Sequence, residues 1–294
     1  MVITSPFQWI MTIHEKMETQ FSVRYGGAMP TALRDALRGE ALVLCLALLN
    51  SRTPDVPAIA AACGYDAVYV DLEHTATSLE TAHLLCASAL GAGISGLVRV
   101  PSHEPSTIAR VLDCGAVGVI VPHVNSKEEA ERVVHAARFP PVGHRSISGS
   151  NALSGYQPQS APQLVELLEQ RTVVAVMIET PEAVEASDSI ASVDGIDMLL
   201  LGPSDLTAEM GIHGQYENHY FHRAVESVAA ACRSHGVALG VAGIKSLDLL
   251  NRFVGLGLRF ISAGTDVGMM TEAATARAQA LRELTGRCEN AAAE

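Results

Sequence analysis

Residues able to do acid–base or metal chemistry stand where several apolar segments of this sequence end. Each would be costly to bury without a partner, so one shared cluster is the simplest interpretation. Such positions meet at one end of a parallel barrel, and we expect a single site there. The segment ends are Asp71-Leu72-Glu73-His74, Arg99, Pro122-His123, Glu179 and Gly202-Pro203-Ser204-Asp205.

Two of these residues, Glu179 and Asp205, are carboxylates that follow consecutive apolar segments. Both could reach one cation, and two carboxylates with open positions for water or substrate oxygens suit Mg²⁺ or Mn²⁺. Alternatively, Glu179 pairs with a lysine or arginine, or it caps the helix that begins at Pro181. The sequence contains no Cys and His spacing typical of structural zinc.

The same cluster offers groups for an anionic substrate and for proton transfer. Arg99 is a permanently charged donor fork that suits a carboxylate or an enolate oxygen, although it could equally pair with Asp71 or Glu73. Histidine is the side chain whose charge ordinarily changes near neutral pH, so His74 is the natural proton-transfer residue of the cluster. The free backbone N–H groups where a helix opens at Gly202–Leu206 could seat an anion.

Eight apolar runs alternate with segments of helical spacing. The runs lack polar alternation, as expected for parallel strands covered on both faces, and their number predicts an α/β fold of the (β/α)8 barrel (TIM barrel) type. A doubly wound open sheet is the alternative, but it usually carries a Gly-rich turn after its first strand, and the first run here continues without glycine into Arg52. The predicted strands are Leu42–Leu48, Ala67–Asp71, Gly96–Val100, Val117–Val121, Val173–Ile178, Asp197–Leu201, Val237–Val241 and Leu258–Ser262.

Proline at first helical positions and glycine after last turns delimit the helices. The predicted helices are Pro54–Cys63, Ser78–Leu90, Pro105–Cys114, Ser126–Ala137, Pro181–Ile190, His219–His235, Ser246–Val254 and about Asp266–Leu284. One long insertion, Arg138–Ala161, follows the fourth helix, and loops of this length are usually functional.

Composition narrows the class of protein. Among 294 residues, 32 Asp and Glu stand against 20 Lys and Arg, and the net charge of −12 disfavours nucleic-acid binding. No stretch approaches the roughly 18 apolar residues that a membrane span needs. The six cysteines are scattered, which predicts reduced thiols in a cytoplasmic protein. We expect residues 1–29 to be a weakly ordered extension or an arm packed on a neighbouring subunit, residues 30–287 a single barrel domain, and residues 288–294 a tail.

Six short segments follow one another along the chain: Tyr65–His74, Val98–Pro101, Gly115–Pro122, Arg138–Ser146, Met177–Thr180 and Gly202–Leu206. Together they resemble the HpcH/HpaI aldolase family, whose members include 4-hydroxy-2-oxoheptanedioate aldolase and 2-dehydro-3-deoxyglucarate aldolase. The resemblance spans about residues 31–284. It implies a barrel of the phosphoenolpyruvate/pyruvate superfamily, assembled as a homo-oligomer (hexamer or trimer) whose last helix packs on a neighbouring subunit.

The resemblance also implies divalent-metal (class II) aldol chemistry on pyruvate, with Mg²⁺ or Mn²⁺, or else Co²⁺ or Zn²⁺. Glu179 and Asp205 match the metal-binding carboxylates of the family. Arg99 matches the arginine that holds the keto or enolate oxygen of pyruvate. His74 matches the proton-transfer histidine, and Asp113 matches its acidic partner, supplied by the next subunit or a loop.

Other matches concern the substrate. The backbone amides of Ser204 and Asp205 match those that hold the substrate carboxylate. The resemblance places the departures from the family pattern on the acceptor side of the pocket. They therefore affect which aldehyde is expected, and they do not affect the expected binding of pyruvate. These departures are His123, Met177, Ser204 and Leu48.

The predicted reaction makes or cleaves a 4-hydroxy-2-oxo acid, with pyruvate and an aldehyde as the other partners, through a metal-stabilised enolate. No lysine belongs to the cluster, and Lys245 is the nearest candidate, so a Schiff-base aldolase is the weaker interpretation. Two alternatives stay open. One is a lyase that uses the same enolate differently, as an oxaloacetate decarboxylase or a macrophomate-synthase-like enzyme. The other is a non-catalytic barrel that binds a keto acid.

Overall fold

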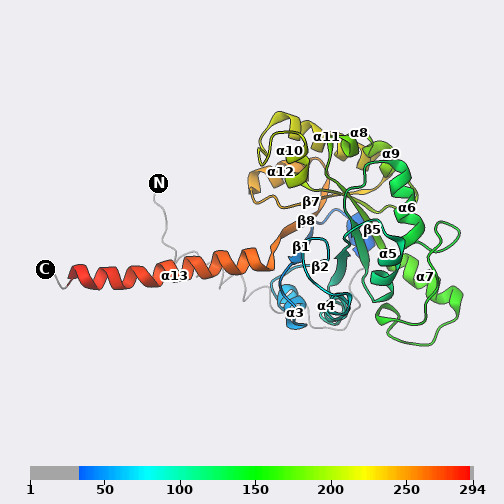
Figure 1. Cartoon of the computed structure of the whole chain (residues 1–294), viewed down its shortest axis with the longest axis horizontal. Coiled ribbons are helices and arrows are strands. Elements are labelled where there is room, and N and C mark those ends of the chain that lie inside the picture. Colours follow the sequence, from blue (N-terminus) through cyan, green and yellow to red (C-terminus); the bar gives the residue numbers. More distant parts are fainter. Residues whose placement is uncertain (1–32, 292–294) are drawn as a thin grey trace. The chain divides into compact units, whose positions relative to one another are not determined.

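Eight parallel strands close into a barrel in the order in which they occur along the chain, which confirms the predicted fold (Figure 1). The computed structural model describes residues 33–291, with side chains described to residue 283. The predicted extension, residues 1–29, lies outside the described residues. The strands are β1 Val43–Leu48, β2 Ala67–Asp71, β3 Ser95–Arg99, β4 Gly118–Val121, β5 Val173–Ile178, β6 Met198–Leu201, β7 Ala238–Ala242 and β8 Leu258–Thr265.

Helices follow the strands, and most of those between β1 and β8 cover the outside of the barrel (Figure 1). They are α2 Leu33–Arg38, α3 Asp55–Ala62, α4 Leu79–Gly91, α5 Pro105–Asp113, α6 Lys127–Ala137, α7 Ala161–Arg171, α8 Pro181–Glu185, α9 Ser187–Ala191, α10 Pro203–Glu209, α11 His219–His235, α12 Leu247–Gly255 and α13 Asp266–Ala291, with a 3₁₀ turn η1 at Ala152–Ser154. Two differences from the prediction stand out. The expected helix Pro181–Ile190 is two short helices that meet at Ala186, and α7 was not predicted. Within residues 33–291, no helix combines the length and apolar character required to cross a membrane.

Alternate strand residues divide between two apolar layers. Inside the barrel, the packed side chains include Leu97, Ile120, Met177, Leu200 and Phe260. Facing the helices, they include Val98, Val119, Val176, Leu199 and Val241. Helix α2 closes the end of the barrel where the strands begin, because its Leu33 and Leu37 belong to the inner layer.

The strand register brings the chemically active residues to the other end, which we call the mouth. Asp71 is paired with Arg99 across β2 and β3, and Ile178, just before Glu179, is paired with Leu201 across β5 and β6. The insertion 138–160 lies elsewhere. It links the end of α6 to α7 and β5, so it is a connection at the end opposite the mouth.

Candidate active site

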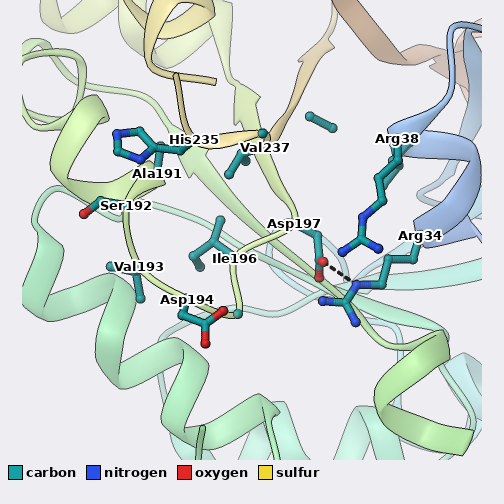
Figure 2. Close-up of a pocket in the computed structure, with 14 residues that line it drawn as sticks. Arg34, Arg38, Ala191, Ser192, Val193, Asp194, Ile196, Asp197, His235 and Val237 are labelled. Carbon is teal, nitrogen blue, oxygen red and sulfur yellow. Dashed lines mark hydrogen bonds and ion pairs between the residues drawn. The ribbon is translucent and has the colours of Figure 1, made fainter. Parts of the chain in front are cut away.

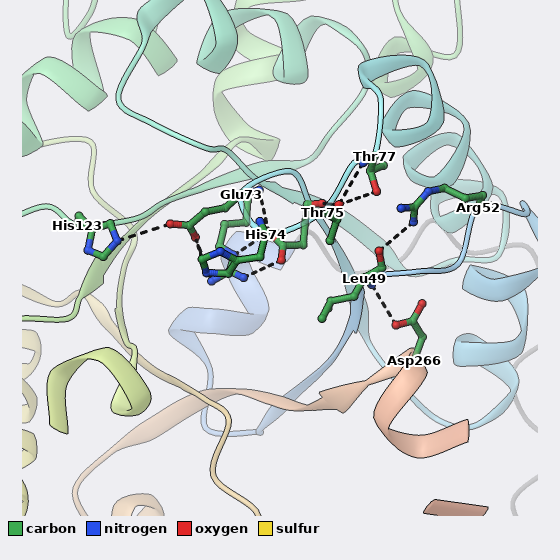
Figure 3. Close-up of polar contacts among 10 residues, drawn as sticks. Leu49, Arg52, Glu73, His74, Thr75, Thr77, His123 and Asp266 are labelled. Carbon is green, nitrogen blue, oxygen red and sulfur yellow. Dashed lines mark hydrogen bonds and ion pairs between the residues drawn. The ribbon is translucent and has the colours of Figure 1, made fainter. Parts of the chain in front are cut away.

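A paired aspartate, Asp71, holds Arg99 at the mouth. Figure 3 shows Glu73, His74 and His123 of the same site. The Nε and Nη2 groups of Arg99 donate to the two carboxylate oxygens of Asp71 at 3.0 and 2.8 Å. Burial favours a higher pKa for Asp71, but the Arg99 guanidinium and the backbone N–H groups of Glu73 and His74 outweigh it and hold that pKa below its usual value. The sequence left an ion pair and a substrate-binding role both open for Arg99, and the ion pair is present. The ion pair fixes the orientation of the guanidinium. The remaining nitrogen, Nη1, faces Glu73.

Glu73 adds a second carboxylate beside the same guanidinium. Its Oε2 lies 3.1 Å from Arg99 Nη1 and 3.7 Å from His74 Nε2. That oxygen is buried and has no hydrogen bond of good geometry among the described residues. Its Oε1 lies 3.6 Å from Nε2 of His123. Glu73 is therefore under-satisfied, as expected of a group that awaits a ligand.

Glu179 occupies a cradle between β5 and β6. Its carboxylate is buried, and a Cβ at Gly202 would come within 2.6 Å of Glu179 Oε1 and 2.7 Å of its Cγ. Burial raises the pKa of the Glu179 carboxyl, the backbone N–H and ring of His123 oppose that rise, and the charges of Glu73 and Asp205 add to it. Glu179 does not cap the next helix, because Thr180 does. The negative charge of Glu179 is unfavourable in this position. A bound cation or a proton would compensate for it.

Asp205 lies in the first turn of α10, directly after β6. Its side chain is exposed, and its charge acts on Glu179. The neighbouring Ser204 hydroxyl lies 3.3 Å from the Tyr216 hydroxyl. The structure thus brings together the two carboxylates that the sequence assigned to a cation.

His74 stands at the rim of the mouth. Its side chain is 60% exposed, and its closest carboxylate is Glu73 at 3.7 Å. An imidazole in this position can rotate and exchange protons with solvent while it stays beside Arg99 and Glu73. That freedom is what a proton-transfer residue needs.

Asp113 is the last residue of helix α5, which runs back from the mouth toward the end where the strands begin. There it accepts a hydrogen bond from Arg145 Nη2 at 2.7 Å and one from the Ser148 hydroxyl at 3.2 Å, both from the long insertion. The described contacts of Asp113 are therefore with the insertion of its own chain and do not include His74. Its expected role toward His74 of a neighbouring subunit stays a prediction.

His123 is a site residue whose function the sequence did not assign. Its φ of +53° is uncommon for a residue other than glycine, and such backbone conformations concentrate at functional sites. The backbone N–H donates to Glu179 Oε2 at 2.9 Å, and the ring Nδ1 lies 3.4 Å from the same oxygen. The ring therefore bridges Glu179 and Glu73. Its position after an apolar run was the only sequence signal.

A second missed residue, Arg52, lies in the loop after β1. Its Nη1 donates to the carbonyl oxygens of Leu49 and Ser51 at 2.9 and 3.2 Å. The backbone N–H groups of Leu49, Asn50 and Ser51 donate to the carboxylate of Asp266, at the start of α13. Only a run of turn-forming residues marked this loop in the sequence.

The residues present fit a divalent cation. Asp71 and Glu73 pair with the Arg99 guanidinium at the mouth, and two further carboxylates, Glu179 and Asp205, lie on neighbouring strand ends. Among the described residues no three His, Cys, Asp or Glu side chains converge on a closed metal site. A hard cation that keeps water and substrate oxygens needs only one or two protein carboxylates, so this open set is suitable.

A hollow of about 300 Å³ lies at the opposite end of the barrel (Figure 2). Arg34, Arg38 and His235 line it, together with Asp197. Arg34 Nε is bound to Asp197 at 2.7 Å, and His235 is bound to Asp188 at 3.0 Å. Because most of these charges are paired within the chain, we place the site at the mouth.

Fold and strand-end residues together are those of a (β/α)8 barrel enzyme. The chain belongs to the HpcH/HpaI aldolase/citrate lyase family, which it matches over residues 45–273. It is a carbon–carbon lyase of the aldolase type, as the sequence predicted.

Individual relatives agree with this assignment. The chain is 36% identical to the 4-hydroxy-4-methyl-2-oxoglutarate aldolase of Hapsidospora irregularis over 74% of this chain and 82% of that protein. An HpcH/HpaI aldolase from Desulfitobacterium hafniense superposes with a TM-score of 0.79 at 31% identity, over 87% of this chain and 97% of that one. Macrophomate synthase superposes with a TM-score of 0.76 at 25% identity, over 93% and 98%.

Proposed function

We propose that the mouth generates the enolate of pyruvate and uses it to make or cleave 4-hydroxy-2-oxo acids. In cleavage, the bond between C3 and C4 breaks, its electron pair enters the enolate, and the C4 hydroxyl loses its proton to give the aldehyde. The enolate then takes a proton at C3 to give pyruvate. The observation that carries the proposal is the buried Glu179 in its glycine cradle, where the charges of Asp205 and of Glu73, the partner of Arg99, act on it.

Glu179 and Asp205 would hold the cation, Mg²⁺ or Mn²⁺ by their oxygen donors, with Co²⁺ or Zn²⁺ as further candidates. When bound, such a cation acts as a Lewis acid toward a keto acid. The family is generally divalent-metal dependent, which supports this assignment.

The protein groups then divide the work. Arg99, held by Asp71, donates to the keto oxygen and stabilises the negative charge that develops there. The backbone N–H groups of Ser204 and Asp205 bind the substrate carboxylate. His74 moves the proton, and its position at the solvent-exposed rim lets it reload from water.

Asp113 would act on His74 of a neighbouring subunit, in a homo-oligomer (hexamer or trimer). Two features support an assembly. Asp113 lies at the end of the barrel away from the mouth of its own chain. The side chains of α13 from Gly268 to Glu283 are all exposed, although they include Met269, Met270 and Leu281. We place the enzyme in the cytoplasm, where its cysteines stay reduced.

The alternative is a lyase that forms the same enolate by decarboxylating oxaloacetate, or that adds it to another acceptor. The structural similarity to macrophomate synthase supports this alternative. Arg99 and the two carboxylates would serve both reactions unchanged, so only the leaving group distinguishes them.

Pyruvate release from 4-hydroxy-4-methyl-2-oxoglutarate and from oxaloacetate, measured with and without Mg²⁺, tests the proposal. We expect metal-dependent cleavage of the aldol that EDTA abolishes and that Glu179→Gln loses. The matched control is Glu182→Gln, an exposed glutamate one turn further on, which should keep full activity. Turnover of oxaloacetate alone would replace the aldolase by the decarboxylase, and undiminished activity of Glu179→Gln would overturn the metal assignment.

A further inference from the structure

The hollow of about 300 Å³ at the end where the strands begin has no part in the proposed reaction. Helix α2 contributes Arg34 and Arg38 to its lining, and residues 191–197, which lead from α9 into β6, contribute another part of it. Figure 2 shows the two arginines extending from α2, while Asp194 extends from the segment before β6. The hollow is therefore lined by two separate parts of the chain, and both carry charged side chains.

Asp197 also lines the hollow, but its carboxylate is already engaged within the fold. Its Oδ1 accepts a hydrogen bond from Arg34 Nε at 2.7 Å, and its Oδ2 accepts hydrogen bonds from Arg138 Nη2 and the backbone N–H of Val174. Arg34 Nη1 donates to the carbonyl oxygen of Glu169 at 3.0 Å. Arg34 is thus held in place, and its Nη2 group has no hydrogen-bond acceptor among the described residues.

Arg38 and Asp194 are two unpaired charges of opposite sign. Among the described residues, neither side chain forms a hydrogen bond or an ion pair, and both are exposed. They do not pair with each other, although both line the same hollow. An exposed arginine alone is ordinary surface charge, but an unpaired cation and an unpaired anion on one hollow are complementary to a ligand that carries both charges.

The hollow also has an apolar part. Leu37, Val193 and Ile196 line it, and each of them has no more than 8% of its surface exposed. These side chains can contact the carbon chain of a ligand, while the charged side chains bind its ends. A volume of about 300 Å³ is at the small end of the range for small-molecule sites, so the ligand has only a few carbon atoms.

We propose that this hollow binds a small amino acid, with its carboxylate on Arg38 and the Nη2 group of Arg34 and its ammonium group on Asp194. A carboxylate fits the planar edge of a guanidinium, and an ammonium group pairs with a carboxylate. A plain carboxylic acid would leave Asp194 unpaired, and a plain amine would leave Arg38 unpaired. The zwitterion should therefore bind more tightly than either. This site is independent of the reaction at the mouth.

Titration calorimetry with four five-carbon probes tests the assignment. The isomers 5-aminopentanoate and norvaline are zwitterions that differ in the separation of their two charges, whereas pentanoate and pentylamine each carry one charge. We expect at least one zwitterion to bind about 10-fold more tightly than pentanoate and pentylamine. The isomer that binds more tightly then gives the spacing of the two charges.

Three substitutions connect this binding to the hollow. Arg38→Gln should weaken binding of the zwitterion by about 10-fold or more, because a charge-assisted pair of hydrogen bonds is lost. Asp194→Asn should weaken binding of the zwitterion but not that of pentanoate, because it removes only the partner of the ammonium group. Arg132→Gln, an exposed arginine on α6, is the matched control and should leave binding unchanged. All three side chains are exposed, so the midpoint of thermal unfolding should stay close to that of the wild type.

Glu179→Gln distinguishes the hollow from the mouth and should bind the zwitterion as the wild type does. Loss of binding in this variant would place the ligand at the mouth and overturn the assignment. Three other results would also overturn it: pentanoate that binds as tightly as both zwitterions, undiminished binding by Arg38→Gln, and no saturable binding of either zwitterion at about 10 mM.

Discussion

Both ends of the barrel carry buried charges. At one end the charges are paired within the chain, and at the other end some of them are not. At the end where the strands begin, Arg138 is buried and donates to Glu169, Asp197 and the carbonyl oxygens of Thr172 and Gly195. At the mouth, one arginine faces an excess of carboxylates, and Glu179 is left with a raised pKa. Charge that is neutralised within the chain stabilises the fold, whereas charge left over is available for a ligand.

Individual side chains illustrate this contrast. The mouth contains His123 with a positive φ and an under-satisfied Glu73 oxygen. The closed end has Arg34 and Arg138 converging on Asp197. Barrel enzymes place chemistry at one end and stability at the other, and here the separation is visible in which ion pairs are complete. Substitutions at the mouth should therefore lower the activity, whereas substitutions at the closed end should lower the free energy of unfolding.

Glu179→Gln should have the largest effect at the mouth. We expect metal-dependent pyruvate release to fall by about 10³-fold or more, because a cation carboxylate is lost while the cradle at Gly202 is still filled. A carboxyl with a raised pKa in the fold costs stability once pH rises through that pKa. The metal-free variant should therefore be as stable as the wild type at pH 7, or more so, by thermal unfolding. A large loss of stability would show that Glu179 stabilises the fold, as the charged residues of the closed end do.

Arg138→Met should show the reverse. Removing a buried arginine leaves Glu169 and Asp197 short of a partner, which should lower the free energy of unfolding by about 3–5 kcal/mol. Activity per folded molecule should not change. Urea unfolding measures the first effect and an active-site titration the second. Arg132→Gln, on the surface, should cost no more than about 0.5 kcal/mol.

His74→Ala should separate proton transfer from binding. We expect a loss of about 100-fold in turnover with unchanged affinity for pyruvate in calorimetry. Because the side chain is mostly exposed, the midpoint of unfolding should stay close to that of the wild type. Unfolding of this variant would mean that His74 is structural.

Asp266 is a mouth carboxylate that accepts backbone N–H groups from the loop after β1, so it should behave like a residue of the closed end. Its pKa is lowered in the fold, so its contribution to stability is present above its unfolded pKa of about 4 and is lost as pH falls through the folded value. Asp266→Asn should lower the free energy of unfolding by about 1–2 kcal/mol at pH 7. The difference from the wild type should shrink at pH 3. An equal difference at both pH values would contradict the assignment.

Much of the fold and part of the site were predictable, because strand ends in a parallel barrel follow from apolar runs and turn residues. Four strand-end residues, His74, Arg99, Glu179 and Asp205, were expected at the mouth and lie there. Helix α7 was missed because its sequence follows a long polar insertion, and Pro181–Ile190 divides at Ala186 although its spacing is helical throughout.

Other features could not be predicted because they depend on three-dimensional position. The place of Asp113 is set by the direction of α5, and its expected role depends on a neighbouring subunit. The bridge from His123 to two carboxylates requires a backbone conformation that no sequence pattern announces. The contacts of the loop that carries Arg52 could not be predicted either, because its backbone N–H groups donate to Asp266, which is remote in the sequence.

The proposed reaction depends on one step, in which pyruvate loses a methyl proton and becomes an enolate at the mouth, with a cation held by Glu179. Proton NMR of pyruvate in D₂O measures this most directly, with wild type and Glu179→Gln, each with Mg²⁺ and then with EDTA. We predict that the methyl protons exchange for deuterium only with the wild-type enzyme and Mg²⁺. Exchange that continues in EDTA, or that Glu179→Gln catalyses as well as the wild type, would contradict the account.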